Sequence, residues 1–209
     1  VDGAQAPREE VDLRLLELLA EQNRRVPLAL ALLLVIVAGL GTLRLPAWIP
    51  LAWLVLALGT LAVRWRLLTR LPLQLPLPPR QRVHQAAVMS LVSGSVHGLT
   101  LAAFPVLHDA DRSFVTLLML GLATGAVATT AGHRRIFAGY VLPTAVPLPL
   151  LWALNPGALY PGWAEFSLAL LLVLYLWVLA GLARNAWRNF SDMVEMRFRG
   201  NDVAFKTDE

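Results

Sequence analysis

The 209-residue chain contains no cysteine. Disulfide frameworks and thiolate metal sites are therefore excluded, and cysteine usage says nothing about the redox compartment. Charged side chains are also scarce, at 15% of the residues, whereas hydrophobic residues make up 57%. A single soluble domain of this composition would expose most of its apolar surface, so the composition predicts an integral membrane protein.

Catalytic patterns are missing as well. The apolar segments contain no nucleophile and base pair, no glycine-rich phosphate loop and no paired carboxylates. We therefore expect no enzymatic activity from this chain and no cofactor. The net charge of +4 comes from basic residues that flank apolar runs, where such residues set membrane topology. It does not indicate a nucleic-acid partner.

Six apolar runs are each close to the roughly 20 residues that a spanning helix needs: 26–43, 47–63, 83–107, 113–132, 136–154 and 164–183. Residues 8–25 before them have the pattern of an amphipathic helix, which we expect to lie in the membrane interface; a helix docked on another domain is the alternative. The predicted fold class is all-α, an integral membrane bundle of six transmembrane helices (26–183). An N-terminal segment (1–25) and a C-terminal linker (184–209) flank this bundle.

The basic residues predict the topology. With the N-terminus in the cytoplasm, sixteen of the eighteen lysines and arginines lie inside, and only Arg44 and Arg112 lie outside. The positive-inside rule then makes both termini cytoplasmic, as expected in a bacterial inner membrane. The segment 64–82 is rich in proline and arginine, which predicts an extended cytoplasmic strap facing anionic headgroups. The outer connections are too short for an extracellular binding domain.

Small residues recur every four positions in the third and fourth runs: Ala86, Ser90, Gly94, Gly98 and Ala102, then Gly121, Gly125 and Thr129. This spacing lets two backbones approach closely, so it predicts that these two helices pack on each other at the centre of the bundle. A pore lining is the alternative. The fifth run contains Pro143, Pro147 and Pro149. Interior prolines free carbonyl groups, so we expect a kink there, and a moving hinge is a further hypothesis.

His97 is the one ionisable residue deep within a run, flanked at helical spacing by Ser93 and Thr100. An intramembrane ionisable residue is a candidate for function. Three interpretations stay open: a neutral imidazole that only packs, a ligand or proton sensor, and a metal or haem ligand. The candidate signal-sensing residues are His97, Ser93, Thr100, Tyr140, Pro143, Thr144 and Pro147.

The loop His108-Asp-Ala-Asp111 offers three side chains to a divalent cation. Three such groups on a short loop are more typical of a solvated turn, so no metal site is predicted there.

The last apolar run continues into a polar segment without a break. No proline or glycine interrupts residues 182–199. One helix is therefore expected from Glu165 to Arg199, roughly 50 Å long against a hydrocarbon core of about 30 Å. Its projecting part carries Ala183, Trp187, Phe190 and Val194 at the spacing of a coiled-coil seam. We expect Trp187, Phe190 and Val194 to form a homodimer and output surface. A helix lying on the lipid headgroups is the alternative.

Several stretches resemble the six-helix membrane input domains of bacterial sensor histidine kinases and diguanylate cyclases. They are LLELLAEQNRR (15–25), the arginine- and proline-rich loop after the second run, GLATGAVA (121–128), FAGYVLPTAVPL (137–148) and RFRGNDV (197–203). In that family the sixth helix leads through a helical linker into a kinase or cyclase module. The resemblance implies an excised receptor domain of a signal-transduction or two-component system, with that module following in cis.

Two functions from different classes follow. The first is a transmembrane signal-input domain that senses a membrane-accessible or small lipophilic ligand and relays it through the last helix. The second is a small transporter or lipid-handling protein with its substrate site at the proline-broken fifth helix. Transporters usually show internal repeats or paired broken helices, and the sequence contains one such interruption. The input domain is therefore the favoured prediction.

Overall fold

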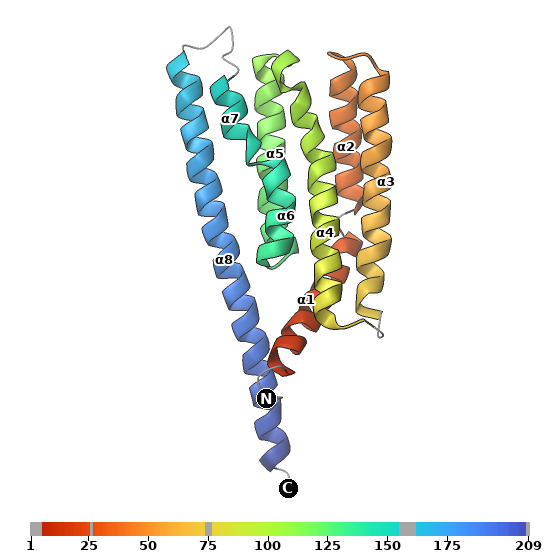
Figure 1. Cartoon of the computed structure of the whole chain (residues 1–209), viewed down its shortest axis with the longest axis vertical. Helices are drawn as coiled ribbons and strands as arrows, with labels where there is room; N and C mark the ends of the chain where they lie inside the picture. The colour runs from red at the N-terminus through yellow and green to blue at the C-terminus, as the bar shows by residue number, and fades with distance from the viewer. Residues whose placement is uncertain (1–5, 26, 74–76, 155–161, 208–209) are drawn as a thin grey trace.

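A computed structural model describes residues 6–25, 27–73, 77–154 and 162–207, and this part of the chain contains helices and no strand (Figure 1). The elements are α1 (Ala6–Arg25), α2 (Pro27–Thr42), α3 (Trp48–Arg70), η2 (Leu71–Leu73), α4 (Pro79–Gly98), η3 (Leu99–Val106), α5 (Asp109–Thr129), α6 (Arg134–Thr144), α7 (Pro147–Leu154) and α8 (Gly162–Thr207). The all-α prediction is confirmed.

Among the described residues, five helical segments are long and apolar enough to cross a membrane: 48–73, 79–106, 109–129, 134–154 and 163–197. They coincide with five of the six predicted runs. The remaining run forms α2, whose 16 residues span about 24 Å and fall short of a hydrocarbon core of about 30 Å. It passes the same test only together with α1, across a bend of 55°. The described helices are thus those of a multi-pass membrane protein, with five candidate spans and a sixth if the bent pair crosses as one.

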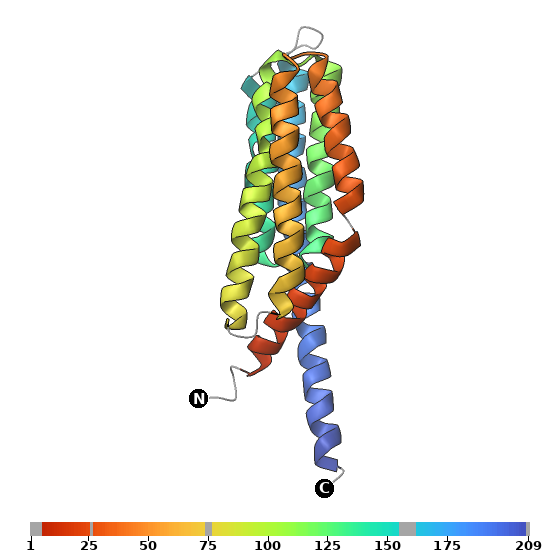
Figure 2. The ribbon, with the colours of Figure 1, turned by 90° about the vertical axis from the view of Figure 1, so that its right-hand side faces the viewer.

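Helices α2 to α7 stand side by side, and α8 runs along one side of them and projects beyond them (Figure 1). We call the end from which α8 projects the terminal end and the opposite end the distal end. At the terminal end α1 crosses the bundle obliquely (Figure 2). Its apolar face is buried against the bundle, with Leu15, Leu16 and Leu19 in one cluster with Leu68 and Leu71. The apolar face of this amphipathic helix is therefore covered by protein.

The predicted extended strap 64–82 is wrong over most of its length. Helix α3 continues to Arg70, η2 follows to Leu73, and α4 begins at Pro79. The helix continues because residues 64–71 contain no proline or glycine, so the basic side chains alone do not end it. Arg82 folds back and donates from Nη1 to the carbonyls of Leu71 and Pro72, both at 3.2 Å. Two of the strap's arginines, Arg64 and Arg82, thus point into the protein.

The small residues of α4 pack against α6, so the predicted pairing of α4 with α5 is wrong. A Cβ at Gly94 would lie 2.6 Å from the carbonyl oxygen of Tyr140, and one at Gly98 would overlap the carbonyl of Pro143. By contrast, no atom of another described segment lies within 4 Å of a Cβ built at Gly121 or Gly125 on α5. A helix with small residues approaches whichever neighbour offers a matching surface, and here that neighbour is α6.

Two neighbouring helices lose their regular α geometry at the same level. The fifth run, where a kink was predicted, is interrupted: α6 ends at Thr144 and α7 begins at Pro147. Next to it, α4 passes at Gly98 into the 3₁₀ helix η3, which is longer than the three or four residues usual for that geometry. The sequence predicted the first irregularity and missed the second.

Candidate functional site

The candidate site starts from a pair of rings at the level of these two breaks. His97 on α4 and Tyr140 on α6 are 2% and 5% exposed, and His97 Nδ1 lies 2.9 Å from the Tyr140 hydroxyl. Their rings meet edge to face, with centroids 5.7 Å apart. Which group donates depends on the imidazole tautomer. Two candidates 43 residues apart in sequence are thus one hydrogen-bonded unit.

Hydroxyls of the candidate set satisfy carbonyl groups beside the two breaks. Thr100 Oγ1 donates to the carbonyl of His97, and Thr144 Oγ1 donates to the carbonyl of Tyr140 at 2.7 Å. Because these hydroxyls are used by the backbone, both threonines hold the irregular helices in place. Pro143 packs on the glycine face of α4, and Pro147 begins α7. These four residues thus lie around the pair, and Thr100 also lines the larger groove described below.

Arg64 completes the cluster, and the sequence analysis missed it because the second run was taken to end at residue 63. Its Nη1 donates to Ser93 Oγ at 3.3 Å, and its Cζ lies 5.9 Å from the centroid of the Tyr140 ring. Within the described part of the chain, no carboxylate lies within ion-pair distance of this guanidinium. The available signal was the position of Arg64 one residue past an apolar run, with no residue between it and Arg70 to end the helix.

A cavity of about 140 Å³ adjoins the cluster. Arg64, Ser90 and Tyr140 line one side. The other sides include Gln22 and Asn23 of α1, Pro27 of α2, and Gly121 and Gly125 of α5. The α5 glycines Gly121 and Gly125 therefore border this cavity.

The second set of predicted residues lies where α8 leaves the bundle. The ring centroids of Trp187 and His133 are 4.7 Å apart, edge to face, and Trp187 stacks on Phe190 at 5.8 Å. Trp187 and Phe190 also join the buried cluster that contains the leucines of α1. Val194 is 9% exposed. The stripe expected to pair with a second copy is thus largely covered within one chain.

A backbone contact tightens this junction, which we call the α8 clasp: α1, the 130–133 turn, Ala183, Trp187 and Phe190. Gly132 in the turn has φ +68°, and a Cβ there would overlap the carbonyl of Ala183. His133 Nδ1 is buried with no hydrogen-bond partner among the described residues. Burial, aided by the neighbouring Arg135 charge, lowers the pKa of His133 from 6.5 to about 4. His133 is therefore a neutral aromatic partner of Trp187 at neutral pH.

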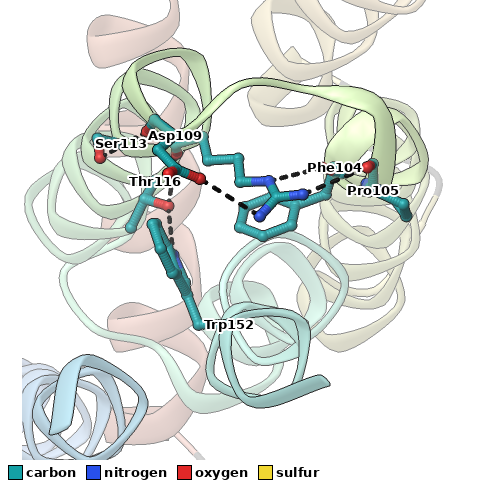
Figure 3. Close-up of polar contacts among 7 residues, drawn as sticks. Phe104, Pro105, Asp109, Ser113, Thr116 and Trp152 are labelled. Carbon is teal, nitrogen blue, oxygen red and sulfur yellow. Dashed lines mark hydrogen bonds and ion pairs between the residues drawn. The ribbon is translucent and has the colours of Figure 1, made fainter. Parts of the chain in front are cut away.

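A polar network closes the distal end (Figure 3). Arg112 is buried and donates from Nε to the carbonyl of Phe104 at 3.1 Å and from Nη2 to that of Pro105 at 3.2 Å. Its Nη1 lies 3.5 Å from Asp109 Oδ1. Trp152 Nε1 donates to Thr116 Oγ1 at 2.9 Å from the other side. Arg112 thus donates to two carbonyls near the end of η3, and that of Phe104 also accepts from the Leu107 N–H at 3.3 Å.

The loop from His108 to Asp111 uses its carboxylates in ion pairs. Asp111 Oδ2 lies 2.9 Å from Arg44 Nε, and Asp109 lies beside Arg112. Both acidic groups thus have arginine partners. A larger apolar groove of about 600 Å³ is lined by α2, α3, η3 and the start of α5, with Trp53, Val106 and Phe114 among its walls.

Comparisons of this chain with family models, with curated proteins and with solved structures find no match.

Proposed function

We propose that this chain is a transmembrane signal-input domain that passes its signal along α8 to a cytoplasmic histidine-kinase or diguanylate-cyclase module in cis. The continuity of α8 carries the proposal. This helix runs from Gly162 to Thr207, about 69 Å, while the neighbouring helices end well short of its tip (Figure 1). A rod of this kind transmits a displacement of the bundle to whatever follows it.

The clasp supplies the coupling in this proposal. Trp187 touches the 130–133 turn between α5 and α6, and Phe190 packs with the leucines of α1. Three helices that border the cavity near Arg64, namely α1, α5 and α6, therefore also contact α8 or adjoin the turn that does, where α8 leaves the bundle. A change in the cavity that displaces α1 would shift α8, because packed interfaces have discrete arrangements rather than continuous ones.

The membrane placement is part of the proposal. The basic residues of the terminal end put both termini in the cytoplasm under the positive-inside rule, and we assign the chain to a bacterial inner membrane. We retain a homodimer but move its seam. Because α1 covers Trp187 and Phe190, a second copy would meet Met193 and Met196, which are 44% and 67% exposed and share one face of α8.

A chimera tests the proposal. The chain is joined after Arg197 to a histidine-kinase module, and kinase output is measured in membranes. Trp187→Ala removes the contact with His133 and should change the output several-fold. Arg188→Ala alters the next, exposed residue and should leave the output unchanged. Equal output from the parent and both variants would refute coupling through the clasp.

The transporter or lipid-handling alternative has one observation in its favour. Both α4 and α6 lose regular geometry at the same level, and paired discontinuous helices often border transport sites. Fluorescent-lipid redistribution in vesicles containing the purified chain discriminates between the two functions. An input domain should give the rate of empty vesicles. Faster redistribution that Pro147→Ala abolishes would favour the alternative.

A further inference from the structure

We propose that the cavity beside Arg64 is a binding site for an oxyanion, a carboxylate or phosphate group. Its sources are the headgroup of a membrane amphiphile or a small free anion. The site itself stands on the geometry of the cavity, and its role as the input site rests on the proposed function.

The side chain of Arg64 is oriented toward the middle of the bundle. Arginines near a membrane surface usually direct the guanidinium outward to water. Side chains of a helix lean toward its N-terminus, and α3 begins at the distal end and finishes at the terminal end (Figure 1). Arg64 therefore leans toward the middle of the bundle. Its partner Ser93 lies 14 residues into α4, about 21 Å from the start of that helix at the terminal end.

The guanidinium of Arg64 has no negatively charged partner among the described residues. A guanidinium has five N–H donors, and among the described residues the one acceptor of Arg64 is Ser93 Oγ. The facing Tyr140 ring supplies its π face and no negative charge. A charge away from bulk water is costly without a partner, and an oxyanion would supply both the opposite charge and bidentate acceptors.

The surroundings of the cavity suit such a headgroup. Its volume of about 140 Å³ is close to that of a cavity able to hold one benzene molecule, which is roughly the size of a small anionic group. The α1–α2 wall contributes the neutral amides of Gln22 and Asn23, and the described residues that line the cavity include no acidic side chain. The Tyr140 hydroxyl becomes a further donor when His97 Nδ1 carries a proton.

The α5 wall offers room for an attached chain. Gly121 and Gly125 line the cavity, are exposed on the bundle surface, and have no atom within 4 Å of a built Cβ. On a helix in a membrane, exposed positions face lipid. An amphiphile could thus place its headgroup at Arg64 and leave its tail among the lipid chains.

Thermal unfolding of the whole purified chain in nonionic detergent tests the site with three probes: decanoate, decanol and inorganic phosphate. Decanoate should raise Tm by about 5 °C at a hundred times its Kd, and decanol should not. A rise with decanoate alone identifies a membrane amphiphile as the source. A rise with phosphate as well identifies a free anion. No rise with either anion, or an equal rise with decanol, would overturn the proposal.

Matched variants separate binding from folding. Arg64→Met should abolish the rise without lowering the Tm of the anion-free protein, because it removes an unpaired charge; Arg66→Met, at an exposed position on the same helix, should keep it. Gly125→Leu fills the cavity and should abolish the rise. Gly59→Leu has equal room outside the cavity and should keep it. A rise that survives in Arg64→Met refutes the site. If the rise behaves as expected while decanoate leaves the chimera's kinase output unchanged, the proposed function fails and the anion site stands.

Discussion

Two arginines at the distal end make similar ion pairs but differ in how deeply their side chains are buried. Arg112 and Arg44 each pair with one carboxylate of the same loop, Asp109 and Asp111 respectively. The side chain of Arg112 is 9% exposed and that of Arg44 is 39% exposed. We predict that Arg112→Met destabilises the protein strongly, whereas Arg44→Met has little effect.

The difference in magnitude follows from what each guanidinium holds. Without Arg112, the carbonyl of Pro105 loses the donor Nη2, whereas that of Phe104 loses Nε and keeps the N–H of Leu107 at 3.3 Å. A buried acceptor left unsatisfied costs about 1–3 kcal/mol, so this part of the loss lies at the low end of that range. Asp109 also loses a buried partner, and breaking a buried pair alone costs about 3–5 kcal/mol. We therefore expect a loss of about 3 kcal/mol or more. A largely exposed pair such as Arg44 and Asp111 contributes at most about 1 kcal/mol, and salt screens it.

Equilibrium unfolding in mixed micelles, followed by tryptophan fluorescence, measures both changes in the free energy of unfolding. Raising the salt concentration should shrink the Arg44 effect and leave the Arg112 effect nearly intact. Equal losses for the two variants, or a larger loss for Arg44→Met, would refute the account of the distal network.

Three further predictions concern packing, pH and assembly. Gly98→Ala should destabilise the protein, because its Cβ would overlap the carbonyl of Pro143, whereas Gly125→Ala should be neutral or stabilise α5 by up to about 1 kcal/mol; thermal unfolding compares them. Because its pKa is lowered, the His133 imidazole stays neutral in the folded protein. The stability that this neutral imidazole contributes is therefore complete above pH 6.5. This contribution should fall by up to about 3 kcal/mol as the pH drops from about 6.5 to about 4, and His133→Phe should flatten that part of the unfolding profile. If the dimer seam follows the exposed methionines, Met193→Cys should form an intermolecular disulfide in membranes and Ser191→Cys, on the opposite face of α8, should not. Equal cross-linking of both would refute this seam.

Hydropathy located the helices well because the membrane imposes their length and composition. Five of six runs match spanning segments, and the long last helix follows from the absence of proline and glycine between residues 182 and 199. The ends of the helices were harder to predict from the sequence. Arg64 looked like the start of a loop by charge, but a helix continues through basic residues when nothing local stops it.

The spacing of residues along a helix did not predict which neighbouring helix each face packs against. The glycines of α4 predicted a close approach, and they make one with α6 rather than α5. The seam at Trp187 and Phe190 predicted a partner, and α1 supplies it within the chain. Periodicity marks a face that must be covered, but which surface covers it depends on the three-dimensional arrangement of all the helices.

The function itself is tested most directly by changing the phase of α8. In the kinase chimera, one to seven alanines are inserted after Met196, upstream of the junction. Each added residue rotates the output module by about 100°, so seven residues bring it back to within about 20° of its starting orientation. If α8 transmits the signal as a rigid helix, kinase output should change at one and two insertions and return near its starting value at seven. Output that is independent of the number inserted, or that declines steadily with it, would contradict a relay through α8.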